Sequence, residues 1–259
     1  MKSVAILQND ANQGPGYLLE FLANHDVPFH LIKVCEGDSI PSVARDFSGL
    51  VVLGSTHSVN ERLHWLNQES ALLAYALRAN VPILGHCFGG QLLAKALGAT
   101  VHANTQPHIG WNTAYPIQQK LDWFDKYQRF EAFHWHYESF AIPECAQRVL
   151  FGSHSLNVGF ASGPHLGLQC HLEVTEDIIR GWCQQGREEV KRHESAQTVQ
   201  QVDEILRLMP SRLPALRRVA QHVYSHWIKG LERSRVHAVW HRSSSSETYF
   251  NHSYSRVNR

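Results

Sequence analysis

Short apolar runs alternate with segments of helical periodicity along the first hundred residues. Strand-like runs fall at 3–8, 28–34, 49–54 and 81–86, and helical patterns fall between and after them at 16–25, 65–80 and 89–98. Two of the strand-like runs are continuously apolar over four or five residues, as is typical of parallel strands that helices cover on both faces. The alternation predicts βαβ units and therefore an α/β fold with a doubly wound, mostly parallel sheet.

The pattern changes after Gly98. Short segments, several with alternating apolar and polar positions, follow one another with turn residues between them, at 100–104, 110–117, 129–136, 139–143, 148–153, 157–162 and 166–171. Such segments predict an antiparallel extension that returns to the sheet.

Helical patterns return after this extension. Thr175 is a predicted helix N-cap, with Glu176 and Asp177 placing negative charge in the first turn. Two further helices are expected over about 198–209 and 214–231, where apolar residues recur at helical spacing.

The chain is expected to divide into three parts. These are a main domain over residues 1–193, a helical appendage over 194–232, and a tail over 233–259 that is rich in Ser, Arg and His. The tail lacks any apolar periodicity, so we expect it to be disordered.

Charge is unevenly distributed along the 259 residues, although the net charge is only +1. From Ser211 onward nine Lys or Arg stand against two Glu, a local charge of +7, and the residues before Ser211 carry −6. An acidic body without a basic stripe argues against nucleic acid as a partner. The apolar stripe of the basic segment predicts that it packs on this acidic body and does not bind a membrane.

Composition excludes several classes of protein. Hydrophobic residues make up 43% and charged residues 18%, which is unlike collagen-like, coiled-coil or wholly disordered chains. No apolar segment indicates a signal peptide or a membrane span, so we expect a cytoplasmic protein with no membrane partner. Five cysteines without a close pair argue against a disulfide framework or a zinc ribbon, and leave a free thiol available as a nucleophile.

One such thiol lies where an apolar strand runs directly into a helix. The turn reads Gly85-His86-Cys87-Phe88-Gly89. A nucleophile at the middle of such an elbow needs small residues two positions before and after it, because strand and helix approach closely there. The N-terminus of the following helix favours a thiolate. A phosphate-binding turn is the alternative, but it would have more glycine and a Lys, Ser or Thr.

A base and an acid for this thiol are expected near the end of the last predicted strand. His171 and Glu173 are two positions apart, so in an extended chain both side chains project to the same side. They are candidates for the second and third members of a triad with Cys87. Cys170 points the other way and is expected to be buried filler.

A metal site is the competing interpretation of the histidines. His134, His136 and His171 could supply ligands, but Glu173 is better explained as a triad member than as an acidic ligand. We therefore expect no metal and no other cofactor.

The elbow and the His-x-Glu pair, together with the segments VVLGSTHSVNE, IGWN and FHWHYESF, resemble the class I (triad) glutamine amidotransferases, in particular the stand-alone, GMP-synthase-like ones. The resemblance covers roughly residues 40–185. It implies a flavodoxin-like fold in which Cys87 attacks the side-chain amide of glutamine. His171 then protonates the departing ammonia and activates water, Glu173 orients His171, and a glutamyl thioester is the intermediate.

The resemblance also implies where the substrate lies. The backbone N–H of Phe88 and the turn at Gly54 and Ser55 are the expected oxyanion donors, although the family commonly has Gly-Gly-Pro at this turn. Gln91 matches the family glutamine that contacts the amino-acid end of the substrate. Further substrate contacts are expected in the loop whose backbone holds the substrate, at Trp135, His136 and Tyr137. The family usually has His-Gly-Asp where this chain has His-Tyr-Glu.

Three functions remain open at this point. The first is an amidotransferase that releases ammonia from L-glutamine to a separate synthetase subunit or to solvent. The second is a cysteine hydrolase of γ-glutamyl amides or peptides, which would use the same triad on another leaving group. The third is a catalytically silent binding module that keeps the fold.

Overall fold

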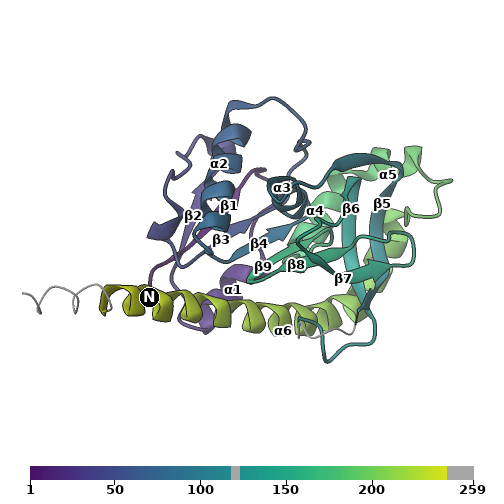
Figure 1. Ribbon diagram of the computed structural model, residues 1–259. Coiled ribbons are helices and arrows are strands. Elements are labelled where there is room, and N and C mark those ends of the chain that lie inside the picture. Colours follow the sequence, from purple (N-terminus) through teal and green to yellow (C-terminus); the bar gives the residue numbers. More distant parts are fainter. Residues whose placement is uncertain (118–122, 244–259) are drawn as a thin grey trace, which may run out of the picture.

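The structure, a computed structural model, describes residues 1–117 and 123–243, and only the backbone of 232–243. In these residues the strands form a single nine-stranded sheet (Figure 1). Its spatial order is β2 (Phe29–Lys33), β1 (Val4–Gln8), β3 (Gly49–Val52), β4 (Ile83–His86), β9 (His165–Leu168), β8 (Gly159–Ser162), β7 (Gln147–Gly152), β5 (Val101–Pro116) and β6 (Phe130–Phe140).

The first five strands in this order pair in parallel, and helices cover both faces. Side chains of β1 alternate between the two faces. Val4 and Ile6 join a core cluster with α1 (Tyr17–Asn24), whereas Ala5 and Leu7 join a cluster with α2 (His64–Arg78) and α3 (Phe88–Ala96). The predicted flavodoxin-like, doubly wound sheet is thereby confirmed.

The antiparallel extension returns to this sheet as the sequence predicts. β8 pairs antiparallel with β9, and β9 then runs parallel to β4. Since parallel strands end at the same edge, this pairing brings the residues after β9 next to the turn after β4. Two details were wrong. The segments expected at 100–104 and 110–117 belong to a single long β5, whose pairing with β6 is irregular between Ala103 and His108. The segments expected at 129–136 and 139–143 likewise belong to the single strand β6.

Three α-helices follow the sheet in the described residues. α4 (Glu176–Gln185) begins as predicted, because the Thr175 side chain accepts a hydrogen bond from Ile178 N. Two short 3₁₀ turns lie earlier in the chain, at Val34–Glu36 and Ala44–Asp46. α5 (Arg187–Arg192) is a short helix after α4.

The last helix corrects the sequence analysis. The two helices expected over 198–209 and 214–231 are one continuous α6 (Val202–Ser243), which contains Pro210 and Pro214. Proline inside a helix costs hydrogen bonds. Here the apolar face that packs on the core continues across both prolines, from Ile205 through Leu216 to Trp227, and this packing outweighs the loss. α6 includes the first part of the expected tail, and residues 244–259 lie outside the described residues.

α6 packs on the body as its apolar stripe predicts. It runs beneath the sheet from the antiparallel strands to the parallel side, along the lower edge of Figure 1. Arg217 lies over the ring of Tyr17 at 4.2 Å, and Arg212 pairs with Glu131 at 3.2 Å. No helix in the described part of the chain is both long and apolar enough to cross a membrane.

Candidate active site

Cys87 occupies a strained turn between β4 and α3. Its φ is 50°, a left-handed conformation that side chains other than glycine rarely adopt. A Cβ at Gly85 would overlap the backbone of Gly89, and a Cβ at Gly89 would overlap the backbone of Val52. Both positions flanking the thiol therefore require glycine, and the turn has the geometry expected of a nucleophile elbow.

His171 and Glu173 lie beside this turn, just beyond the end of β9. The His171 Nδ1 and Glu173 Oε1 atoms are 2.6 Å apart, and both side chains are buried. Burial alone would lower the pKa of His171, but the charges of Glu173 and Cys87 outweigh it and raise this pKa to about 10. The structure thus brings together the three residues predicted as a triad.

Glu173 has a second histidine partner that sequence reasoning missed. His86, at the end of β4, places Nδ1 3.2 Å from Glu173 Oε2, and its Nε2 is 3.3 Å from the hydroxyl of Tyr224 on α6. Burial alone would raise the pKa of Glu173, but His86 and His171 hold it below its usual range. A polar residue within an otherwise apolar strand was the available signal for His86. Tyr224 had none, because it reads as one more member of a helical apolar stripe.

Gln169 was also missed, although it lies in the same predicted segment as His171. Its Nε2 is 3.7 Å from Cys87 Sγ, and its Oε1 accepts a hydrogen bond from Gln91 Nε2 at 3.3 Å. Gln91 Nε2 also donates to the carbonyl of Glu138 at 3.0 Å. The amide nitrogen of Gln91 therefore connects the thiol's neighbour Gln169 to Glu138. The sequence analysis expected a loop at 135–138, but these residues lie within β6.

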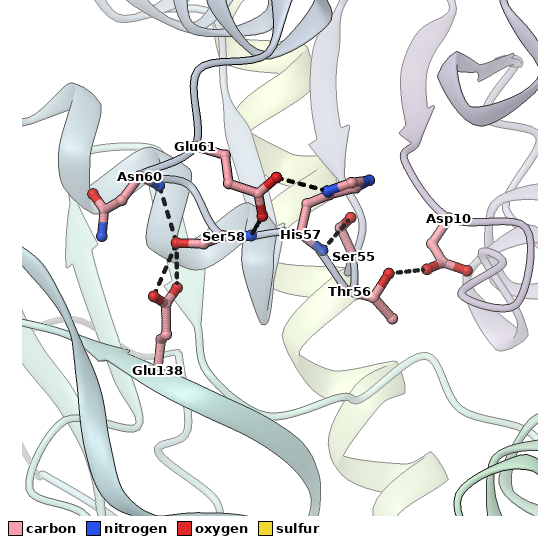
Figure 2. A network of polar contacts seen from close by, with 8 residues as sticks. All are labelled: Asp10, Ser55, Thr56, His57, Ser58, Asn60, Glu61 and Glu138. Atoms are coloured by element: carbon pink, nitrogen blue, oxygen red, sulfur yellow. Dashed lines mark hydrogen bonds and ion pairs between the residues drawn. The ribbon is translucent and has the colours of Figure 1, made fainter.

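The loop that follows β3 is held on two sides by acidic residues. Figure 2 shows Thr56 donating to Asp10 at 2.8 Å, on the side of β1. On the other side the Ser58 hydroxyl lies 2.9 Å and 2.8 Å from the two carboxylate oxygens of Glu138. Glu138, which stands where the family usually has Asp, therefore fixes this loop.

Gly54 and Ser55 begin this loop next to the histidine. A Cβ at Gly54 would overlap the side chain of Gln13 and would lie 3.1 Å from His171 Cε1. Ser55 does not adopt a positive φ, so its side chain imposes no left-handed strain there. Phe88 is the first residue of α3, so its N–H belongs to the first-turn amides that lack a partner within the helix.

The remaining predicted substrate contacts diverge. The carbonyl of Trp135 is 3.9 Å from Cys87 Sγ. His136 instead turns into the protein, where its ring stacks on His108 with centroids 5.0 Å apart. Tyr137 points toward α5, and its hydroxyl donates to Glu189.

Comparison with known proteins agrees with this geometry. Residues 19–178, more than half of the chain, match the family described as glutamine amidotransferase class-I. The chain belongs to this family.

Relatives of this class-I glutamine amidotransferase differ in size. A glutamine amidotransferase-like protein of Salmonella typhimurium, YfeJ, is 24% identical over 216 residues, which cover 78% of this chain and 88% of that protein. The glutamine-hydrolyzing GMP synthase of Aeropyrum pernix is 29% identical over 153 residues, 56% of this chain but 28% of the synthase. The crystal structure of a glutamine amido transferase from Methylobacillus flagellatus is 38% identical, with a TM-score of 0.85 over 89% of this chain and 95% of the other.

A pocket of about 160 Å³ opens on the histidine side of this amidotransferase's site. Trp182, one wall, lies edge-on to His171 with ring centroids 4.8 Å apart. Trp135, another wall, carries the carbonyl near the thiol. The lining residues are Asp10, Asn12, Gln13, Thr56, Trp135, Trp182, Gln185, Gly186 and Glu189.

The histidines that suggested a metal site are arranged otherwise. His134 Nδ1 lies 3.2 Å from His136 Nε2, and burial lowers the pKa of His134 to about 3, so its ring is neutral. Among the side chains that the structure describes, within residues 1–117 and 123–231, there is no group of three His, Cys, Asp or Glu that could hold a metal ion.

Proposed function

We propose that this protein hydrolyses the side-chain amide of L-glutamine, with Cys87 as nucleophile. The observation that carries the proposal is the 2.6 Å contact of His171 with Glu173 beside a thiol on a strained elbow. A nucleophile, a base and an acid that orients the base are the three parts that such a reaction needs.

The reaction proceeds in two halves. His171 takes the thiol proton, and Cys87 Sγ attacks the amide carbon to give a tetrahedral oxyanion. Protonated His171 then gives its proton to the leaving nitrogen, ammonia departs and a glutamyl thioester remains. In the second half His171 removes a proton from water, the hydroxide adds to the thioester carbon, and glutamate leaves as the thiol is restored.

Backbone amides stabilise the oxyanion in this scheme. The Phe88 N–H, at the N-terminus of α3, is one donor, and the turn at Gly54 and Ser55 supplies the other. The contacts of Ser58 with Glu138 and of Thr56 with Asp10 hold that turn in place before substrate arrives. We propose that Gln91 acts on the amino-acid end of the substrate by fixing the backbone at Glu138.

The ammonia passes to a separate synthetase subunit or to solvent. A relative of this chain is named as a glutamine-hydrolyzing GMP synthase, and the chain matches 28% of it. We propose that a synthetase partner of this kind accepts the ammonia and that both act in the cytoplasm, where the thiol stays reduced.

The pocket favours a second candidate function. Because His171 must reach the leaving nitrogen, a group attached to that nitrogen would lie on the side of His171, where Trp182 and Trp135 form pocket walls. Hydrolysis of γ-glutamyl amides or peptides would use this space. A silent binding module is disfavoured, since Cys87, His171 and Glu173 are all present and His171 contacts Glu173.

Release of ammonia and glutamate from L-glutamine tests the proposal, with Cys87→Ser as the control. We expect equal amounts of both products from the wild type and none from the variant. A glutamine-mimicking electrophile should modify Cys87 alone, although Cys35 and Cys145 are exposed. Mass spectrometry that finds another cysteine modified first would reject the mechanism.

A further inference from the structure

Two buried side chains that the proposed reaction does not use lie directly behind Glu173. His86 and Tyr224 are both fully buried, and they continue the line of contacts that begins at His171. Successive distances are 2.6 Å from His171 to Glu173, 3.2 Å from Glu173 to His86 and 3.3 Å from His86 to Tyr224. The line therefore starts at the candidate base, His171, and ends on α6.

The chemistry of these groups favours one arrangement of protons. An ionised carboxylate only accepts hydrogen bonds, and the carbonyl of Cys170, another acceptor, also faces the His86 ring. A neutral His86 serves these acceptors when its proton is on Nδ1, and its Nε2 then accepts from the Tyr224 hydroxyl. Tyr224 thus selects the tautomer of His86 that matches Glu173.

The contact between His86 and Glu173 is electrostatic in the described structure. Neither His86 Nδ1 nor Glu173 Oε2 has a regular hydrogen-bond partner, although they are 3.2 Å apart. Hydrogen bonds of a catalytic site are often poorly aligned in the free enzyme and tighten when substrate binds. Burial lowers the pKa of His86 and raises that of Tyr224, so the first stays neutral and the second keeps its proton at neutral pH.

Charged and titratable groups face this line from several elements. They are Cys87, Cys170, His171 and Glu173 at the ends of β4 and β9, His134 and His136 on β6, Tyr17 on α1, and Arg217 with Tyr224 on α6. The ion pairs of the Glu173 carboxylate oxygens are with His86 of the line itself and with His171.

We propose that His86 and Tyr224 are positioning residues that hold the second oxygen of Glu173, so that its first oxygen orients His171 toward Cys87. This inference rests on the proposed function and deepens it. It makes α6 part of the catalytic assembly, since Tyr224, the last member of the line, lies on this helix, 138 positions after His86 in the sequence.

The experiment uses the full chain with three variants and a matched control. His86→Leu removes the polar ring, whereas His86→Asn keeps an amide N–H near the Nδ1 position. Tyr224→Phe removes only a hydroxyl. Tyr127→Phe is the control, because Tyr127 also packs on α6, against His222, but has no contact in this line.

Two readouts separate positioning from structure. The first is kcat and KM for L-glutamine. The second is the pH profile of Cys87 alkylation by iodoacetamide, followed on the Cys87 peptide by mass spectrometry. The alkylation profile does not depend on turnover, so it tests the positioning even if glutamine proves not to be the substrate.

We expect His86→Leu to lower kcat at least about tenfold with KM within about twofold, because the group acts through Glu173 and not on the substrate. Its alkylation midpoint should move to higher pH by about one unit, since a loosened Glu173 stabilises the imidazolium of His171 less. His86→Asn should restore most of the rate, Tyr224→Phe should lower kcat about threefold, and Tyr127→Phe should match the wild type.

Two sets of results would overturn the inference. One is wild-type kcat and an unchanged alkylation midpoint in both His86→Leu and Tyr224→Phe. The other is equal loss in His86→Asn and His86→Leu with no shift of the midpoint in Tyr224→Phe, which would indicate a packing role. If His86→Leu fails to fold, the midpoints of the Cys87 alkylation profiles of His86→Asn and Tyr224→Phe still test the inference. If the variants show the midpoint shifts but the wild type leaves glutamine intact, the proposed substrate is rejected and the positioning is supported.

Discussion

Two carboxyl groups of this protein are buried to nearly the same extent, but their pKa values are shifted in opposite directions. Glu173 lies at the edge of the sheet between two histidines, and its pKa is held below the usual range despite burial. Glu69 lies on α2, and its Oε1 accepts a single hydrogen bond, from Asn9 Nδ2 at 3.2 Å. Burial raises the pKa of Glu69 to about 8.

The difference shows that the partners, and not the depth of burial, decide the charge state. A neutral amide offsets little of the cost of burying a carboxylate, whereas imidazole rings beside both oxygens more than offset it. Glu173 is therefore an anion at neutral pH and can orient and stabilise a protonated His171. Glu69, a buried residue of α2, is protonated at the same pH.

The largest expected effect comes from removing the helix that covers the Glu173 side. A chain that ends before Ser211 loses Leu216, Val223, Tyr224, Trp227 and Leu231, all buried. Burial of each large apolar side chain contributes about 1.5–3 kcal/mol, so the loss is comparable to the whole stability of a typical domain. We expect this chain not to unfold cooperatively when heated.

A second truncation sharpens this test. A chain that ends before Ser234 keeps the buried face of α6 and should melt within about 2 °C of the wild type. Calorimetry on both chains makes the measurement. Equal melting of the chain that ends before Ser211 and the full chain would show that α6 is not part of the core.

Catalysis should separate the two carboxyl groups next. His171→Ala should lower kcat about 1000-fold and Glu173→Gln about 100-fold, because the base transfers the proton while the acid only orients the base. Glu69→Gln should stay within about twofold at neutral pH. Ammonia release from L-glutamine measures all three. A wild-type kcat in His171→Ala would reject the triad. A loss of kcat in Glu69→Gln as large as that in Glu173→Gln would contradict the contrast drawn between the two carboxyl groups.

Local spacing explains how much of this site the sequence could predict. The elbow at Cys87 and the pair His171 and Glu173 are each encoded within a few residues, and βα alternation indicates the edge of the sheet where they meet. The flavodoxin-like half of the fold follows from the same short-range pattern.

The parts that escaped prediction depend on contacts between distant segments. The role proposed for His86 depends on its contacts with Glu173 and Tyr224. The position of Gln169 depends on its contacts with Cys87 and Gln91. Tertiary packing brings these residues together. The two prolines of α6 predicted a helix break, but a buried face that spans both of them keeps the helix continuous. Local propensity does not contain that packing energy.

Stability against pH should distinguish Glu69 in its own right. A folded pKa of about 8 against a usual 4.5 means that the protonated form is favoured in the folded state. Its contribution to stability is complete below about pH 4.5 and is lost as the pH rises toward 8. Glu69→Gln should remove this loss, so we expect the variant to melt at least about 3 °C above the wild type at pH 8.5 and near it at pH 5. The same difference in melting temperature between Glu69→Gln and the wild type at both pH values would contradict the assignment of a raised pKa to Glu69.

A third carboxylate, Glu189, extends the comparison with the smallest expected effect. It lines the pocket and accepts hydrogen bonds from two neutral donors, the Tyr137 hydroxyl and Trp135 Nε1, the latter at 3.2 Å. Because the Tyr137 ring faces α5 and not the thiol, Tyr137→Phe should change kcat/KM for L-glutamine by less than about threefold.

The same variant leaves Glu189 with only the Trp135 donor of these two at the pocket wall, so it should alter turnover of a γ-glutamyl dipeptide more than that of glutamine if the pocket receives the leaving group. The measurement is kcat/KM for both donors in the wild type and in Tyr137→Phe. A wild-type preference of about 100-fold for the dipeptide, equivalent to about 2.7 kcal/mol in the transition state, would replace the amidotransferase proposal with the hydrolase.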